Sequence, residues 1–268
     1  MVRDFCDALE KIGLRVNDDK CVVQCSRART YGDSQLIVGS RTLPIVRRED
    51  GFRILGTTLS LDGKTDIEFQ NRMRAAWGKF HGMWPLLGKR DTSVRKRLRL
   101  FNSTVSRTAL WCSESWALTV DEKQQLRTTQ REMLRRIAGP RRVPEESYVD
   151  WIQRATPVAE NRAREAGVPG WLDMHLEAKW AWAAKVVNME DSRLARRVVL
   201  WRDSEWWREQ DHNARTSRPV RKLGGLQRRW EDDLRKFCRD RYGEQWQHLA
   251  KRNDWSERLP VFQQWALR

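Results

Sequence analysis

The side chains most suited to chemistry in this chain are clustered cations. Between residues 72 and 107 the sequence has ten Lys or Arg and one acid, Asp91, so the local net charge is ten minus one, or +9. The ten cations are Arg72, Arg74, Lys79, Lys89, Arg90, Arg95, Lys96, Arg97, Arg99 and Arg107. Because acids for ordinary surface ion pairs are almost absent, the pattern favours binding of a phosphate backbone over a solvated surface with counterions only.

Apolar spacing predicts how part of this cluster is presented. Thr92 and Ser93 are candidate N-caps of a helix, and apolar residues follow at steps of three and four. The expected inward stripe consists of Val94, Leu98, Phe101 and Val105. The cations expected to project to the opposite side are Arg95, Lys96, Arg97 and Arg99. The segment therefore predicts one buried stripe and one wall of positive charge.

The whole chain has the same bias. Its 268 residues have a formal net charge of +16, with 33% charged and 40% hydrophobic residues. That composition supports a folded core and a positive field that attracts a polyanion, for which nucleic acid is the expected identity. A basic protein without such a partner is the alternative. No pattern of base-edge readout stands out, so we expect recognition of backbone and shape.

Cysteines, histidines and apolar runs narrow the class of protein. The five cysteines are odd in number and scattered, which argues against a disulfide framework and for a reducing compartment. The four histidines are isolated, so a zinc site is not expected. No apolar run approaches the roughly 18 residues of a membrane span, and the N-terminal segment contains acids, unlike a signal peptide. We expect an intracellular protein, nuclear or cytoplasmic and not secreted, with no membrane partner.

Tryptophan is unusually frequent, with 15 residues against 3 Tyr and 7 Phe. Indoles stack on bases, which offers one interpretation. Most of these Trp, however, are at helical spacing beside Leu, Val and Met, and that pattern favours packing in a core.

The order of elements predicts an α+β fold that is mostly α, with a small β-containing region first. Within residues 1–65 we expect a helix from Val2 to Ile12 that ends at Gly13, then a strand around Cys21–Val23. QLIVGSRTLPIV predicts a hairpin, and FRILGTTLSLDG predicts two short extended pieces with an Asp-Gly turn.

Residues 66–140 predict a basic helical region. The first helix has a stripe of Phe69, Met73, Trp77, Phe80, Trp84 and Leu87. Pro85 is expected to fray or kink its end. The second helix is the one capped near Ser93. The third opens with a capping box of Thr119 and Glu122 and stops at Gly139-Pro140. Its stripe consists of Leu126, Met133 and Ile137.

Residues 141–210 predict a loop rich in Arg, Pro and Glu, followed by a further amphipathic helix. That helix uses Leu172, Leu176, Trp180, Ala183 and Val187. Residues 211–225 read as a polar, basic linker, and residues 226–268 as a C-terminal helical unit. The linker adds three candidate nucleic-acid-binding residues, Arg218, Arg221 and Lys222. The stripe expected in the C-terminal unit is Leu226, Trp230, Leu234 and Phe237.

Several segments in this order resemble the reverse transcriptase of LINE-type, non-LTR retroelements, from the end of its palm through its thumb and beyond. They are ALEKIGLRVNDDKCVVQCS (8–26), FRILGTTLSLDG (52–63), LWCSESWALT (110–119), LRTTQREMLRRIAG (126–139), LQRRWEDDLRKF (226–237) and QWQHLAKRNDW (245–255). The resemblance covers nearly the whole chain. It implies a palm remnant over 1–65, a thumb over 66–140 and a helical region beyond.

The resemblance also implies roles for single residues. Lys20 matches a lysine near the leaving pyrophosphate and is a possible proton donor; a surface lysine after a turn is the equal alternative. Leu55 and Gly56 belong to the segment that grips the primer end, although a plain hairpin would use them equally. The partner implied is RNA or an RNA–DNA hybrid duplex.

One departure from the family bears on activity. Polymerases need carboxylates that hold two metal ions near the primer hydroxyl, and the family's Tyr-x-Asp-Asp hairpin has no match here. Asp18-Asp19 is on the turn of GLRVNDDK, and Asp232-Asp233 is beside arginines that could pair with it at helical spacing. We therefore expect no catalytic residues and no cofactor in this chain, with Mg²⁺ bound only by a complete polymerase.

Three functions stay open at this point. The first is a retroelement polymerase fragment that binds template–primer and is inactive alone. The second is a helical protein-interaction module derived from a retroelement. The third is a half-enzyme that works with the missing palm in trans.

Overall fold

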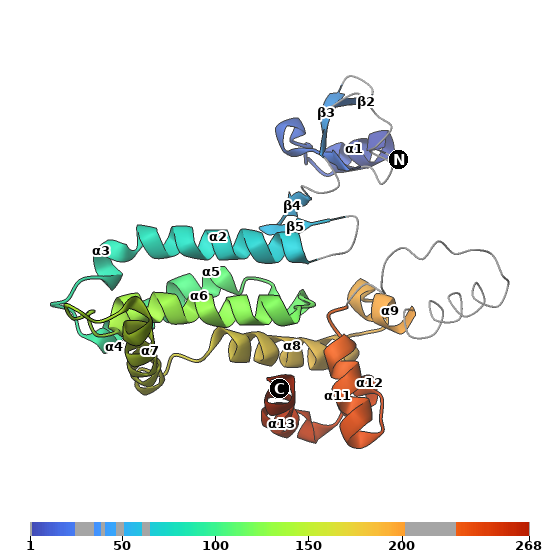
Figure 1. Ribbon diagram of the computed structural model, residues 1–268. Helices are drawn as coiled ribbons and strands as arrows, with labels where there is room; N and C mark the ends of the chain where they lie inside the picture. Colours follow the sequence, from blue (N-terminus) through green and yellow to red (C-terminus); the bar gives the residue numbers. More distant parts are fainter. Residues whose placement is uncertain are drawn as a thin grey trace, which may run out of the picture. The chain divides into compact units, whose positions relative to one another are not determined.

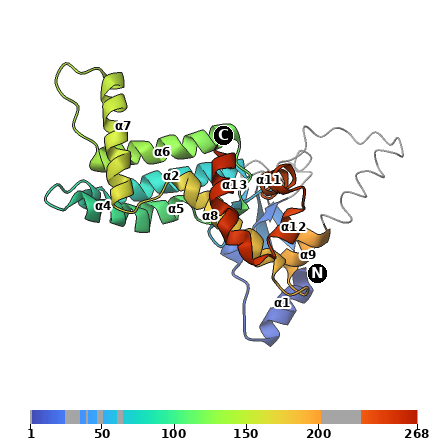
Figure 2. The same ribbon diagram turned by 90° about the horizontal axis from the view of Figure 1, so that it is seen from below.

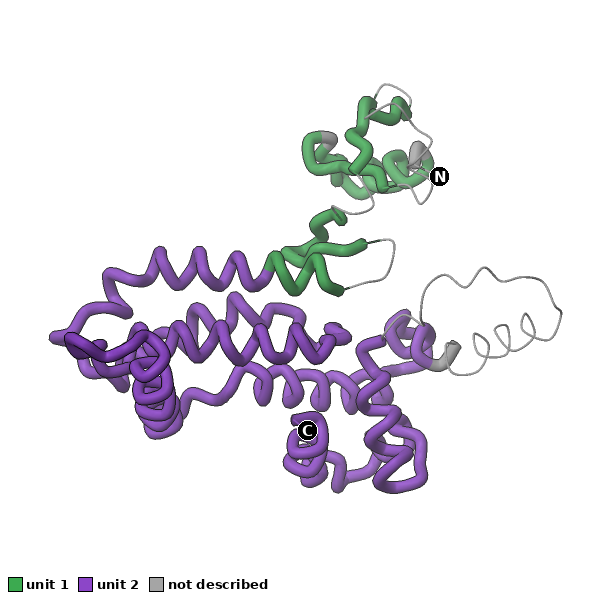
Figure 3. Tube along the Cα trace, viewed as in Figure 1, with its two compact units in different colours: residues 1–71 green, residues 72–268 purple. Residues whose placement is uncertain are grey.

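The computed structural model describes residues 2–24, 35–38, 41–46, 51–60, 65–201 and 229–267. The described part is mostly helical, and its strands all lie between residues 23 and 59, so the predicted fold class is confirmed. The chain forms two compact units, residues 1–71 and 72–268 (Figure 3). The boundary between them, after residue 71, falls inside one helix, α2 (Asp66–Gly82).

The first unit begins with α1 (Val2–Lys11), which ends one residue before the predicted Ile12. The predicted terminating residue, Gly13, follows with a φ of +78°. A three-stranded sheet follows, in the order β1-β3-β2. Its strands are β1 (Val23–Gln24), β2 (Gln35–Val38) and β3 (Arg41–Val46). The β2–β3 pairing is antiparallel, as expected for the predicted hairpin, while β1 pairs with β3 in parallel. Arg41 Nη1 donates to Cys6 Sγ at 3.1 Å and so ties the sheet to α1.

A separate hairpin joins β4 (Phe52–Ile54) to β5 (Thr57–Leu59) through the two residues Leu55 and Gly56. Both turn residues have positive φ, +49° and +87°, which is the conformation of a tight hairpin turn that favours glycine. The predicted Asp62-Gly63 turn lies outside the described residues. Two side chains from the start of α2 hold this hairpin. Glu68 Oε2 accepts from the Thr58 amide at 2.6 Å, and Asn71 Nδ2 donates to Thr58 Oγ1 at 2.9 Å.

The second unit starts with the predicted helices. They are the rest of α2, then α3 (Trp84–Leu87), α4 (Val94–Phe101), α5 (Arg107–Ala109) and α6 (Val120–Ala138). A π-helical turn over Asn102–Ser106 links α4 to α5. Figure 1 shows α2 and α8 on opposite sides of α6, within the second unit. The indole of Trp77 and the guanidinium of Arg136 meet across the α2–α6 side at 5.1 Å.

Capping residues and apolar stripes in the sequence predicted the positions of these helices. Ser93 caps α4 by accepting from the Lys96 amide, and Thr119 and Glu122 form the full capping box of α6 with bonds of 3.1 and 2.7 Å. The stripes of all three predicted helices are largely buried. Trp77 and Val94 are half-buried, and one member is exposed: Trp84 begins α3, beyond the end of α2 at Gly82, and is 40% exposed.

One long helix was not predicted. α7 (Tyr148–Glu165) occupies the expected loop and lies across the C-terminal half of α6 (Figure 2). Its buried face consists of Ala155, Ala159 and Ala163, so it has no stripe of large apolar residues to signal it. Pro157 inside the helix also argued against it. The small alanine face allows α7 to approach α6 closely.

The remaining helices close the second unit. They are α8 (Trp171–Val187), α9 (Leu194–Trp201), α11 (Asp232–Tyr242), α12 (Trp246–Leu249) and α13 (Leu259–Ala266). The predicted stripe of α8 is buried throughout. In the C-terminal stripe, Leu234 and Phe237 are buried, Trp230 precedes the helix, and Leu226 lies outside the described residues.

Most of the described indoles pack in the fold. Trp180 stacks on Trp255 with ring centroids 3.6 Å apart, and each indole Nε1 donates to the other residue's carbonyl at 2.9 and 3.1 Å. Among the Trp side chains that the structure describes, only Trp84 and Trp111 are exposed. Packing, rather than a base-stacking surface, therefore accounts for most of the tryptophan.

A buried polar group ties α8 to α11. Lys179 of α8 is 1% exposed, and its Nζ contacts Asp233 Oδ2 at 2.8 Å. Asp233 thus forms an ion pair with a residue of another helix. One turn before Lys179, the ring of His175 is fully buried and stacks on Trp116. Burial lowers the pKa of His175 well below its usual range, and the positive charge of Lys179 lowers it further.

This histidine predicts a loss of stability in mild acid. The fold keeps His175 neutral, whereas the unfolded chain takes up a proton as the pH falls below about 6.5. The free energy of unfolding therefore falls by up to about 1.4 kcal/mol per pH unit below that value. Urea denaturation at pH 7.5 and 5.5 measures the loss, and His175→Phe is expected to reduce it. His248→Phe changes an exposed histidine and serves as the matched control. An unchanged pH dependence in His175→Phe would contradict this origin.

Candidate nucleic-acid interface

The cations of α4 fall into two groups. Arg95, Lys96 and Arg99 are exposed, and their spacing of three and four residues places them on one face of the helix. Leu98 and Phe101 on the other side are fully buried. Arg99 is partly anchored, because its Nε donates to the carbonyl of Ala166 at 3.4 Å.

Arg97 does not belong to that exposed face, and its prediction was wrong. It is 6% exposed, and its guanidinium serves backbone carbonyls. Nη1 donates to Leu87 O at 2.9 Å and to Ile137 O at 2.7 Å, and Nε donates to Thr92 O at 3.1 Å. Leu87 ends α3 and Ile137 is in the last turn of α6, where carbonyls lack helical partners. The side chain faces inward because those acceptors lie there.

The other predicted cations of the second unit are accessible. Arg74 and Lys79 on α2 and Arg107 on α5 are exposed, while Arg72 is half-buried and has an interaction of its own. Of the ten cations between 72 and 107, Lys89 pairs with Asp91 at 3.3 Å. Setting aside Arg72, Lys89 and Arg97 leaves seven of the ten, and none of these has an ion pair with any acid in the described part of the chain. The seven are Arg74, Lys79, Arg90, Arg95, Lys96, Arg99 and Arg107.

The remaining predicted residues lie elsewhere. Lys20 is exposed at the end of a 3₁₀ turn, Asp18–Lys20, in the first unit. Leu55 and Gly56 form the tip of the β4–β5 hairpin, and Leu55 is 92% exposed although its φ is in the left-handed region. Leucine rarely adopts that conformation. Arg218, Arg221 and Lys222 lie outside the described residues.

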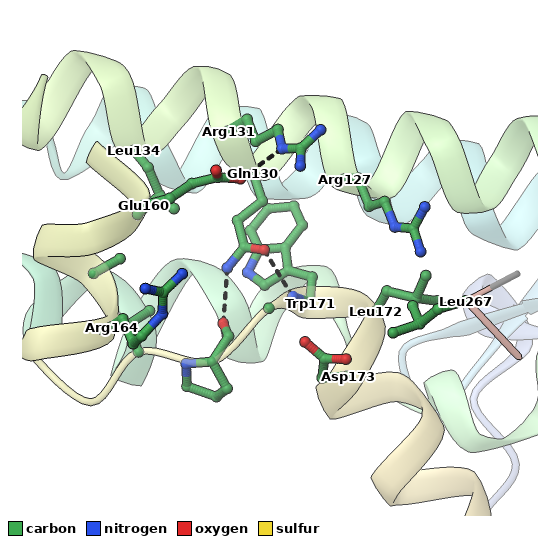
Figure 4. Close-up of a pocket in the computed structure, with 14 residues that line it drawn as sticks. Arg127, Gln130, Arg131, Leu134, Glu160, Arg164, Trp171, Leu172, Asp173 and Leu267 are labelled. Atoms are coloured by element: carbon green, nitrogen blue, oxygen red, sulfur yellow. Dashed lines mark hydrogen bonds and ion pairs between the residues drawn. The ribbon is translucent and has the colours of Figure 1, made fainter. Parts of the chain in front are cut away.

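One cavity of the second unit lies between α6, α7 and the start of α8, with a volume of about 540 Å³ (Figure 4). Gln130 crosses it, because its Nε2 donates to Pro169 O at 2.9 Å and its Oε1 accepts from the Trp171 amide at 2.7 Å. Arg131 Nε contacts Glu160 Oε1 at 2.6 Å. The Gln130 bonds fix the turn that leads into α8.

The charges around this cavity are mixed. Three arginines line it, Arg127, Arg131 and Arg164, together with the carboxylates of Glu160 and Asp173. Burial raises the pKa of Asp173, and the positive charge of Arg127 opposes that shift. Two acids in the lining weaken the attraction for a phosphate, so we regard this cavity as a structural junction.

A second cavity has a very different lining. It has a volume of about 340 Å³ and lies where α3, α4, the C-terminal end of α6 and α7 meet. The residues that give it its character are Trp84, Arg90, Arg97, Arg136, Arg141 and Arg162, and we call it the arginine pocket. No acid lines it. Sequence reasoning missed it because its arginines come from separate segments between residues 90 and 162, one of them the unpredicted α7. The feature of the sequence that could have indicated this pocket is the Arg141-Arg142 pair after Gly139-Pro140.

Metal binding, membrane insertion and similarity to known proteins are three further properties that bear on the class of this protein. Within the described ranges, no three His, Cys, Asp or Glu side chains are grouped as metal ligands would be. None of the described helices combines the length and hydropathy that a bilayer-crossing segment requires. The chain matches no family model, no curated protein and no solved structure.

The two classes of cation on α4 predict different mutational effects. Arg97→Met removes the donors to three carbonyls, so we expect the free energy of unfolding to fall by about 3 kcal/mol, as for loss of charged hydrogen bonds to buried acceptors. Arg95→Met, on the exposed face of the same helix, is the matched control and is expected to change it by about 0.5 kcal/mol at most. Chemical denaturation measures both. Equal effects would show that Arg97 has no special structural role.

Proposed function

We propose that the chain is a nucleic-acid-binding part of a retroelement RNA-directed DNA polymerase and that it holds template–primer through the backbone. The observation that carries the proposal is the set of seven exposed cations between residues 72 and 107 that have no ion pair in the described part of the second unit. Cations left without acids repel one another, and phosphate groups relieve that repulsion. The resemblance to the reverse transcriptase of LINE-type retroelements supplies the identity of the duplex, RNA or an RNA–DNA hybrid.

Helix geometry supports binding to the backbone rather than to base edges. Arg95, Lys96 and Arg99 share one face of α4, and the buried Leu98 and Phe101 fix that helix in the fold. A row of long cationic side chains on a fixed helix follows a line of phosphates and carries no sequence information. Arg74 and Lys79 add cations on α2, and Arg107 adds one on α5. The thumb-like role therefore falls to residues 72–107.

Catalysis is assigned outside this chain. The sequence has no Tyr-x-Asp-Asp segment, and polymerase chemistry needs carboxylates that hold Mg²⁺ near the primer hydroxyl. A palm acting in trans would supply them. In such a complex, Lys20 is the candidate proton donor, and Leu55 and Gly56 are candidates for contact with the primer end.

A helical protein-interaction module is the rival function. It would require exposed indoles grouped away from the cations. The structure describes two exposed indoles, and one of them, Trp84, lines the arginine pocket. We therefore favour nucleic acid as the partner.

Salt dependence tests the proposal. We expect the chain to bind an RNA–DNA hybrid with an affinity that falls steeply as salt rises. The triple variant Arg95→Gln, Lys96→Gln, Arg99→Gln is expected to make the log–log slope shallower by about 2 to 3 units, because each lost phosphate contact removes roughly one. Fluorescence anisotropy across a salt series measures the slope.

The control carries the same loss of charge on another surface. Arg239→Gln and Arg241→Gln change exposed cations of α11, and Lys251→Gln changes an exposed cation in the turn after α12. We expect this triple variant to keep most of the slope. Equal losses in the two triple variants would mean that net charge, and not the α4 face, sets the affinity.

A further inference from the structure

The arginine pocket brings five guanidinium groups around one small cavity. They come from distant parts of the chain: Arg90 precedes α4, Arg97 is within it, Arg136 is on α6, Arg141 follows α6, and Arg162 is on α7. With no acid in the lining, the positive charges are compensated only from outside it. A cluster of like charges of this kind stores electrostatic repulsion that a bound anion relieves.

The five guanidinium groups differ in whether they have a hydrogen-bond or ion-pair partner within the protein. Arg97 is the most buried, and its Nη1 and Nε serve carbonyls, but its Nη2 makes no hydrogen bond in the described ranges. Arg162 Nη1 donates to Ala138 O. Arg136 Nη2 contacts Glu132 Oε1 at 2.6 Å. These three have a structural partner and also line the cavity.

Arg90 and Arg141 have no such partner. Both are exposed, and neither side chain makes a hydrogen bond or ion pair with any residue that the structure describes. The like charges act on one another as well. Burial lowers the pKa of Arg97, and the positive charges of Arg90 and Arg162 lower it further. The pocket therefore has one buried charged group at its lining and two free cations beside it.

Helix ends explain only part of this arrangement. The C-terminal carbonyls of α6 attract cations, since a helix C-terminus carries about half a negative charge. Arg97 and Arg162 meet that need through Ile137 and Ala138. Half a charge does not account for five guanidinium groups. Arg136 pairs with Glu132 instead. Arg90 and Arg141 have neither a helix-end carbonyl nor an acid as a partner among the residues that the structure describes.

Trp84 gives the pocket an apolar side. Its indole is 40% exposed and packs against Gly88, where an added Cβ would lie 2.9 Å from the ring. Phe80 supports it with ring centroids 5.4 Å apart. A held, partly exposed indole beside free arginines is the combination that binds a base and its phosphate together. The volume of about 340 Å³ is at the small end of ligand sites, which run from about 300 to 1,000 Å³.

We propose that the arginine pocket binds a terminal phosphate of single-stranded nucleic acid, with the adjoining base against Trp84. A terminal phosphate carries about 1.5 to 2 negative charges at neutral pH, more than the single charge of an internal one, and the concave arginine pocket suits a strand end better than a backbone running past. This inference rests on the proposed function for the source of the phosphate. It adds recognition of a strand end to backbone binding by the α4 face.

The test compares short oligouridylates with a 5′-phosphate, with a 3′-phosphate and with two hydroxyl ends. We expect one phosphorylated form to bind about ten-fold more tightly than the hydroxyl form, the fold-change that one charged hydrogen bond produces. Arg90→Gln with Arg141→Gln is expected to abolish that ratio, since both residues are exposed and replaceable without loss of fold. Arg95→Gln with Lys96→Gln is the matched control and is expected to weaken all three oligonucleotides while keeping the ratio. Fluorescence anisotropy measures the affinities, and circular dichroism checks the fold of each variant.

Each outcome separates this inference from the proposed function. A ratio of one in the unaltered chain, with salt-dependent binding intact, overturns the terminal-phosphate site and leaves backbone binding standing. Equal loss of the ratio in both double variants also overturns the site. If uridine monophosphate displaces the phosphorylated strand at matching concentrations, the ligand of the pocket is a free nucleotide and not a strand end, and the inference is overturned. If the unaltered chain binds neither a single strand nor a hybrid, the proposed function is overturned. Binding of uridine monophosphate in that case would show that the pocket is a phosphate site for a free nucleotide.

Discussion

The hydrogen bonds of one buried guanidinium organise the basic half of this protein. Arg97 joins the last residue of α3, the residue before the cap of α4 and the last turn of α6 through three carbonyl groups. Helix C-termini leave such carbonyls without partners, and a planar guanidinium with several donors is suited to satisfy more than one of them. The position of α4, and therefore the direction of its exposed cations, depends on this contact.

The same constraint places arginine chemistry at the end of α6. Arg162 from α7 donates to Ala138 beside the Arg97 contact, and Arg135 Nη1 donates to Thr156 Oγ1 of α7 at 3.1 Å. The alanine face of α7 permits this crossing, because larger side chains would hold the backbones further apart. The arginines that donate to carbonyls at helix ends are therefore clustered in one part of the second unit. Once there, they raise the local positive potential beyond what the helix ends require.

The success of sequence reasoning here followed the strength of local signals. Capping residues such as Ser93 and Thr119 act within one turn, and large apolar residues such as Phe101 repeat on one face, so the helices that they define were predicted. Arg97 failed for a specific reason. Positions 94, 97, 98 and 101 fit the spacing of an inward face, but the charge of residue 97 led to its assignment to solvent. A long side chain with several donors can be buried where backbone carbonyls without partners accept from it. The sequence around residue 97 gives no sign of those carbonyls, because they come from other segments.

The features that sequence reasoning missed arise from contacts between distant segments. The alanine face of α7 has the right period, but small residues give little contrast with a loop. The arginine pocket requires α3, α4, α6 and α7 to be placed before its members are neighbours. Leu55 in a left-handed turn was likewise invisible, because leucine carries no signal for positive φ.

Arginine therefore has two roles in the same region, and burial separates them. Where the guanidinium is inside, as in Arg97, its donors are consumed by the backbone and its removal should be felt in stability. Where it is outside and lacks an acid, as in Arg90 or Arg95, its donors remain for a ligand. The two roles depend on each other, since the buried group fixes the helix that presents the exposed ones. A cationic surface built in this way needs no acids nearby to hold its shape. Seven of the ten cations in residues 72–107 have no ion pair with an acid in the described part of the chain, and this leaves their charge available.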